Sequence, residues 1–222
     1  MTTAETCPPL ADRITKSLLG YGVIAGPVYV VAVAAQMAIR DGYDPTRHAA
    51  SQLANGDFGW VQIATFVVTG AMTVAAAVGV GRALGTGRSA AWVAGLLGAF
   101  GVGLIAAGVF RADPSDGFPP GTPMGMAEPS WHGLVHLAVA GVGFICLVAA
   151  CFVLANRFAS DGEPGWAWFS RFTGALFAGS FVFMSSGLGR AAAVLLFTAA
   201  VVVAWAWLSA VSVKLYRGVG AI

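Results

Sequence analysis

The sequence predicts an all-α membrane protein, a bundle of six transmembrane helices with a short helix in a loop on its outer face. Hydrophobic residues make up 58% of the 222 residues and charged residues 10%, and the mean hydropathy is +0.79, which excludes an ordinary water-soluble domain. Apolar windows of about 20 residues, the length that crosses a bilayer, recur with almost no internal charge. Because they are continuously apolar and do not alternate in polarity, helices are expected rather than a barrel.

Six segments meet this length requirement, and they define one helical domain. They are Ser17–Ile39, Trp60–Ala83, Ala90–Phe110, His132–Ala155, Trp168–Gly187 and Ala191–Leu215. The domain is therefore expected at residues 17–215, with an amino-terminal tail at residues 1–16 and a carboxy-terminal tail at residues 216–222. Cys7 falls in the first tail, whereas Cys146 and Cys151 lie inside the fourth span, so all three are expected to be free thiols.

The distribution of Lys and Arg predicts the orientation in the membrane. Eight basic residues lie on the side of the two termini: Arg13, Lys16, Arg82, Arg88, Arg157, Arg171, Lys214 and Arg217. Four lie on the other side: Arg40, Arg47, Arg111 and Arg190. Cytoplasmic loops carry the excess of positive charge, so both termini are expected in the cytoplasm and the protein in the cytoplasmic membrane. No basic cluster points to a nucleic acid as partner.

Small and polar residues within the spans have two interpretations. Gly22 and Gly26 form a GxxxG pattern, which favours close helix packing. One face of the second span carries Gln62, Thr65, Thr69 and Thr73. This stripe either forms hydrogen bonds between helices or lines a path through a transporter.

The first outer loop contains the segment GYDPTRHAASQLANGDFGW. Asp44 and Pro45 fit the cap and first position of a short helix that would run through Arg47, His48, Ser51 and Gln52 to Gly56. On such a helix Ser51 shares a face with His48 and also meets Arg47. The helix is either a capped interfacial element or part of a site in which Ser51 and His48 are the catalytic candidates.

A second group of polar residues follows the third span. FRADP contains Arg111 and Asp113 and begins a Pro/Gly-rich loop, and WHGLVH then places His132 and His136 on one face of the fourth span. His136 lies about one turn inside the membrane, where an ionisable side chain usually faces a protein interior or a wet cavity. It is either a functional residue or a neutral imidazole that is hydrogen-bonded between helices.

The order of these motifs resembles a known family. YDPxRHxxSxLxxGxxGW near the first span, GVFxxDP after the third and HGxxH at the start of the fourth are similar to the bacterial membrane proteins grouped as the domain of unknown function 998 family. The resemblance extends from about Gly20 to the fifth helix. It implies a six-helix membrane domain in a bacterial cell membrane and no established activity.

The candidate residues all belong to the outer end of the bundle, where we expect a polar pocket that binds a small molecule, a lipid or a metal ion. The ligand-pocket candidates are Asp44, Arg47, His48, Ser51, Arg111, Asp113, His132 and His136. Asp44 or Asp113 paired with Arg47 or Arg111 would instead pin the loops over the helix ends.

Several functions remain open for this pocket. A zinc ion held by His132 and His136 with His48, Asp44 or Asp113 would make the protein a hydrolase of a lipid-linked substrate. Haem is disfavoured because only His136 lies convincingly within a span. A transporter, or a scaffold subunit without catalysis, is the alternative from another class. The sequence predicts no particular substrate and no oligomeric state.

Overall fold

The computed structural model of the protein describes residues 9–125 and 128–220, and Cys7 lies outside them. Within these residues the chain forms six long α-helices and one short 3-10 helix: α1 Leu10–Ile39, η1 Ala50–Ala54, α2 Gly59–Leu84, α3 Arg88–Val109, α4 Trp131–Ser160, α5 Pro164–Ser185 and α6 Arg190–Gly218. Five of the six α-helices are long and apolar enough to cross a membrane, and α5, which carries Arg171, is the less apolar one. The predicted helical membrane bundle is confirmed.

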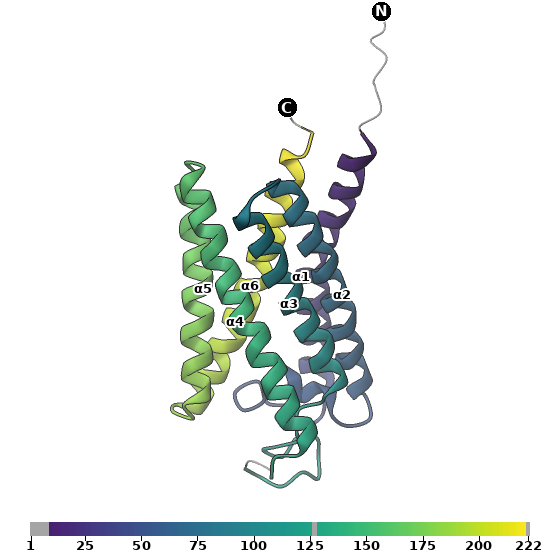
Figure 1. Ribbon diagram of the computed structural model, residues 1–222. Coiled ribbons are helices and arrows are strands. Elements are labelled where there is room, and N and C mark those ends of the chain that lie inside the picture. The colour runs from purple at the N-terminus through teal and green to yellow at the C-terminus, as the bar shows by residue number, and fades with distance from the viewer. Residues whose placement is uncertain (1–8, 126–127, 221–222) are drawn as a thin grey trace, which may run out of the picture.

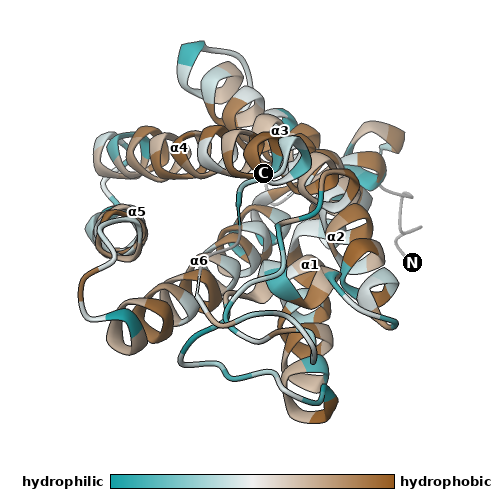
Figure 2. Cartoon of the chain, turned by 90° about the horizontal axis from the view of Figure 1, so that it is seen from below, coloured by the Kyte–Doolittle hydropathy of each residue, from teal (hydrophilic) through white to brown (hydrophobic). Residues whose placement is uncertain are grey.

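The six helices form a ring. Each packs on the next along the chain, and α1 packs on α6 to close the ring (Figure 2). α1 begins and α6 ends at one end of the bundle, which we call the terminal end (Figure 1). Residues 40–58, 110–125 and 128–130 lie at the opposite end, which we call the loop end. α1 starts at Leu10, so the helix extends beyond the predicted span, which begins at Ser17.

Glycines allow the closest helix contacts in the ring. A Cβ atom on Gly26 of α1 would lie 2.9 Å from the carbonyl oxygen of Trp205 on α6. Gly70 of α2 and Gly101 of α3 face each other in the same way, because a Cβ on either would lie 2.6–2.8 Å from the other's carbonyl oxygen. Backbones that approach this closely leave no room for a side chain. The GxxxG pattern of α1 therefore packs against α6.

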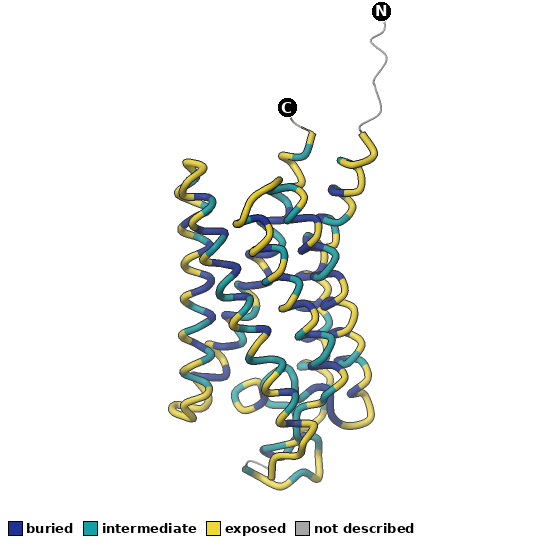
Figure 3. The backbone as a smooth tube through the Cα atoms, in the orientation of Figure 1, coloured by how far each residue is buried: buried dark blue, intermediate teal, exposed yellow. Residues whose placement is uncertain are grey.

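Large apolar side chains face outward as well as inward. Val31 on α1, Ile145 on α4 and Val182 on α5 are each 67–68% exposed, and Figure 3 shows exposed and buried positions alternating along the helices. A soluble protein rarely exposes so many large apolar side chains. In a bilayer they contact lipid, which is as apolar as the protein interior.

The threonine hydroxyls in the polar stripe of α2 are hydrogen-bonded within their own helix. The hydroxyls of Thr65, Thr69 and Thr73 donate to carbonyl oxygens one turn earlier in α2, at 2.6–2.8 Å. Gln62 forms the contact between helices, because its Oε1 accepts from Nε2 of Gln36 on α1 at 2.8 Å. These side chains are buried and do not line the large cavity described below. They support helix packing rather than a transport path.

Candidate functional site

The first loop folds as a turn followed by a 3-10 helix, not as the single helix predicted from Asp44 to Gly56. The carboxylate of Asp44 caps the turn, since its Oδ1 accepts from the backbone N–H and the hydroxyl of Thr46 at 2.9 and 2.6 Å. Its Oδ2 pairs with Arg47 Nε at 2.9 Å. The backbone then becomes extended at Ala49 (φ −67°, ψ 156°), and η1 starts only at Ala50. Consequently His48 and Ser51 do not share a helical face.

His48 explains the break in the helix. Its ring folds back so that Nδ1 accepts from the backbone N–H of Asp44 at 2.9 Å, while Nε2 donates to the carbonyl oxygen of Asp116 at 3.1 Å. The side chain is 1% exposed and packs on Tyr43 and Phe118. Burial lowers the pKa of His48, and the charge of Arg47 adds to this effect. With both ring nitrogens engaged, His48 joins two loops and has no nitrogen left for a metal ion or a substrate.

Asp116 and Arg190 complete this junction, and the sequence analysis missed both as partners. Asp116 has a left-handed backbone (φ 55°) and is 4% exposed. Its Oδ1 accepts from the backbone N–H of Gly125 at 3.2 Å, and its Oδ2 forms an ion pair with Arg190 at the start of α6. The junction thus ties α6 to the loop after α3 and, through His48, to the loop after α1.

Further hydrogen bonds join the two loops into one layer, the roof, which consists of residues 40–58 and 110–125. Arg40 donates to the carbonyl oxygens of Leu53 and Asn55 and lies 5.2 Å from the centre of the Phe118 ring. Gln52 Nε2 donates to the carbonyl oxygen of Asp113 and to the Ser115 hydroxyl, both at 3.0 Å. The roof is therefore a hydrogen-bonded unit rather than two separate loops.

Asp113 holds the start of α4. Its Oδ2 accepts from the backbone N–H of Ser130 at 2.9 Å, and its Oδ1 accepts from the Ser130 hydroxyl. Ser130 in turn caps α4 by accepting from the backbone N–H of Gly133 at 3.1 Å. Gly133 leaves the space that the carboxylate fills, because a Cβ there would clash with Asp113. Negative charge at a helix start is also favourable for the helix dipole.

We expect Asp113→Ala to destabilise the protein by about 1 kcal/mol through loss of this cap. Arg111→Ala is the matched control, since Arg111 is exposed and makes no ion pair within residues 9–125 and 128–220. Thermal unfolding in detergent measures both. Equal losses in the two variants would contradict the capping role and indicate an Arg111–Asp113 pair.

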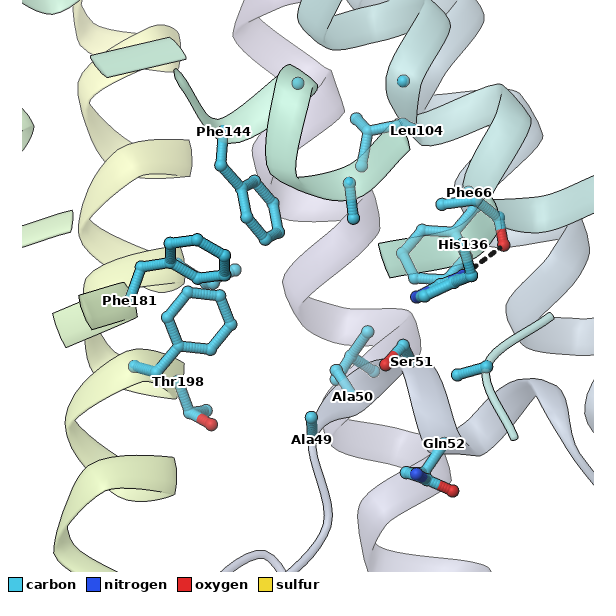
Figure 4. Close-up of a pocket in the computed structure, with 18 of the residues that line it drawn as sticks. Ala49, Ala50, Ser51, Gln52, Phe66, Leu104, His136, Phe144, Phe181 and Thr198 are labelled. Carbon is cyan, nitrogen blue, oxygen red and sulfur yellow. Dashed lines mark hydrogen bonds between the residues drawn. The ribbon is translucent and has the colours of Figure 1, made fainter. Parts of the chain in front are cut away.

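His136 lies on α4 just below the roof and is 4% exposed. Its Nδ1 lies 2.7 Å from the carbonyl oxygen of Phe110 and 3.2 Å from that of Ala107, both at the end of α3. Carbonyl oxygens only accept, so Nδ1 carries the hydrogen and donates. The other ring nitrogen, Nε2, faces the cavity (Figure 4). His136 thus bonds to a neighbouring helix and also presents a free nitrogen.

The structure does not bring the zinc candidates together. His132 is exposed and stacks on Trp131, with ring centres 3.7 Å apart, while His48 is engaged in the roof and Asp113 with Ser130. Among the described residues, no three His, Cys, Asp or Glu side chains are placed to hold a metal ion. Cys146 and Cys151 are free thiols, as predicted. The described residues therefore offer no ready-made set of zinc ligands.

A cavity of about 540 Å³ lies beneath the roof and is lined by residues of all six α-helices, with Phe66 contributed by α2. Its polar wall lies at the loop end, where Ser51, Gln52, Asp113, Ser115 and His136 contribute. Aromatic side chains form much of the rest of the wall, and we call this part of the cavity the aromatic chamber. Its aromatic residues are Tyr29, Phe66, Phe100, Phe144, Phe177, Phe181, Phe197 and Trp205. In Figure 4, His136 and Ser51 face Phe144 and Phe181 across the space. The cavity is thus polar at one end and apolar along its depth.

The motifs that build the roof and the polar wall fall within one family match. A family model described as a protein of unknown function, DUF998, matches residues 23–214, most of the chain. The chain belongs to the DUF998 family. Comparison of this DUF998 protein with curated proteins and with solved structures gives no match for either. The resemblance seen in the sequence is confirmed.

In this DUF998 protein the motif residues lie in three places: the roof, the start of α4 and the wall of the cavity. Asp44 and His48 of the first motif form the roof, and Asp113 of the second caps the helix that the third begins. Ser51 and His136 reach the cavity wall. The aromatic chamber was missed because a phenylalanine in an apolar helix carries no sequence signal that separates a cavity wall from a lipid contact.

Proposed function

We propose that the protein binds an amphiphile from the membrane, with its polar group beneath the roof and its hydrocarbon chain in the aromatic chamber. The observation that carries this proposal is a single cavity with its polar groups at one end and aromatic walls at membrane depth. A volume of about 540 Å³ suits a small-molecule ligand, for which sites span roughly 300–1,000 Å³. Such a site matches a molecule that is itself polar at one end.

The ligand enters sideways from the bilayer. Leu137 of α4 and Val202 of α6 both line the cavity, yet they are 68% and 43% exposed. In the ring these two helices are separated by α5, which packs on both (Figure 2). We infer that a lipid chain reaches the chamber past these exposed side chains on either side of α5, at the level of the hydrocarbon, without crossing the roof.

We infer that the loop end faces away from the cytoplasm of a bacterial cell membrane. The terminal end carries the larger share of Lys and Arg, as the positive-inside rule requires of the cytoplasmic side. The polar group of the ligand then lies at the level of the outer leaflet. A cysteine placed in the roof, as in Asp57→Cys, should react with an impermeant thiol reagent added to intact cells.

Filling the chamber should prevent binding. Ala140 of α4 lines the cavity, whereas Ala138 on the same helix is exposed and does not. We expect Ala140→Trp to retain at most one tenth of the lipid that co-purifies with the wild type, because the indole occupies the ligand's place. Ala138→Trp should retain all of it. Native mass spectrometry of the detergent-solubilised full chain measures the occupancy. Equal occupancy in both variants, or no bound lipid in the wild type, would contradict the proposal.

A hydrolase of a lipid-linked substrate is the second candidate, and one observation favours it. The Ser51 hydroxyl and the free nitrogen of His136 line the same cavity. Acyl transfer requires a nucleophile that comes within hydrogen-bond reach of a base, together with a group that stabilises the oxyanion. Incubation with the extracted ligand separates the two functions: cleavage that is lost in Ser51→Ala supports the hydrolase, and intact ligand supports binding alone.

A further inference from the structure

The hydrogen-bonding state of His136 determines which polar group the cavity accepts. We propose that the ligand is an uncharged amphiphile with a hydroxyl head, and that this hydroxyl donates a hydrogen bond to Nε2 of His136. This inference rests on the proposed function. Phospholipids and fatty acids are then poor ligands for this site.

The backbone fixes the imidazole in one tautomer. The carbonyl oxygens of Phe110 and Ala107 both face Nδ1, so in the neutral ring the hydrogen lies on Nδ1 and Nε2 has only a lone pair. These carbonyls end α3, where the last groups of a helix lack partners within it. Main-chain atoms therefore hold the ring in place. A ligand atom opposite Nε2 must be a donor.

The charges around the cavity exclude an anionic head. No Lys or Arg is present among the described residues that line it. Its carboxylate is that of Asp113, which would repel a phosphate, and this carboxylate is already bonded to Ser130. Burying a phosphate with no opposite charge is strongly unfavourable. The remaining polar groups, which include the hydroxyls of Ser51, Ser115 and Thr198, are neutral.

Three probes that share one hydrocarbon chain and differ only in the head group test which head group the cavity prefers. They are 1-hexadecanol, its methyl ether and hexadecyl phosphate, each added to the full chain in lipid nanodiscs and quantified by native mass spectrometry. We expect the alcohol to bind at least tenfold more tightly than either analogue, because the ether has no donor and the phosphate is charged. His136→Phe should weaken binding of the alcohol about tenfold and leave binding of the ether unchanged, so ether binding also shows that the variant cavity is intact.

The outcomes separate this inference from the proposed function. Equal affinity for alcohol and ether, tighter binding of the phosphate, or an alcohol preference that persists in His136→Phe overturns the hydroxyl assignment and leaves amphiphile binding in place. Loss of ether binding in His136→Phe calls for His136→Gln, whose amide both accepts and donates. That variant must bind the ether, and its preference for the alcohol over the ether must be smaller than in the wild type. Otherwise the assignment fails. Failure of all three probes to bind the wild type overturns both proposals.

Discussion

Replacing His48 with leucine should destabilise the roof by about 2–4 kcal/mol. The change leaves the partly buried backbone N–H of Asp44 and the buried carbonyl oxygen of Asp116 without these partners, and the loss of a partner for a buried group costs about 1–3 kcal/mol. Hydrogen exchange of residues 40–58 and 110–125 measures roof opening directly. His132→Leu is the matched control, because His132 is exposed and lies outside the roof. Unchanged exchange in His48→Leu would contradict the role of the ring.

The same imidazole makes the roof sensitive to acid. Burial lowers the pKa of His48 below its ordinary value of about 6.5, the charges of Arg47 and Arg190 lower it further, and Asp44 opposes them. The closed roof therefore binds fewer protons than the opened one, so its stability is fully present above pH 6.5 and decreases as the pH falls below that value. Protonation also removes the acceptor for the N–H of Asp44.

A pH series tests this assignment to one residue. We expect exchange of the roof amides, corrected for intrinsic rates, to increase between pH 7.5 and pH 5.5 in the wild type and in His132→Leu. The added acid sensitivity should be absent in His48→Leu, whose roof is already open more often. Acid sensitivity that persists in His48→Leu would assign the effect to another group.

The second large effect is expected for Gly101→Ala, which should lower the free energy of unfolding by about 2–3 kcal/mol. The new methyl group would lie 2.8 Å from the carbonyl oxygen of Gly70 and 3.0 Å from the backbone nitrogen of Val74, so α2 and α3 must separate. Gly95→Ala on the same helix is the control, because nothing lies within 4 Å of its Cβ position. That change should be neutral or slightly stabilising, since alanine favours helices.

Unfolding in mixed detergent, followed by tryptophan fluorescence, compares the two glycine variants. The expected result is a clear loss for Gly101→Ala and none for Gly95→Ala. If both variants unfold alike, the contact between α2 and α3 is looser than the structure indicates.

The helices could be predicted because the length of an apolar run can be read directly from the sequence. Each predicted span overlaps the helix that forms, and boundaries differ where polar residues continue a helix beyond the apolar run, as at Leu10. The first loop was not predictable in the same way. Asp44 does cap a turn, but burial of the His48 ring between Tyr43 and Phe118 outweighs continuation of the helix. Local capping signals carry no information about such distant partners.

The candidate site was predicted in part. The prediction that His136 faces a protein interior agrees with its burial, and the Asp44–Arg47 pair forms. Asp116 was missed because its partner Arg190 is distant in sequence and its left-handed backbone depends on the folded loop. Of the eight residues proposed for the pocket, Ser51, Asp113 and His136 line the cavity, whereas Asp44 and His48 hold the loops together.

Closure of the ring by α1 and α6 has a consequence for biosynthesis. α1 is synthesised before α6 and needs it as a neighbour, so the Gly22 and Gly26 face of α1 waits in the bilayer until α6 is inserted. The chamber acquires its last wall, which includes Phe197 and Trp205, at the same moment. A chain that stalls before α6 can insert five helices and still enclose no cavity.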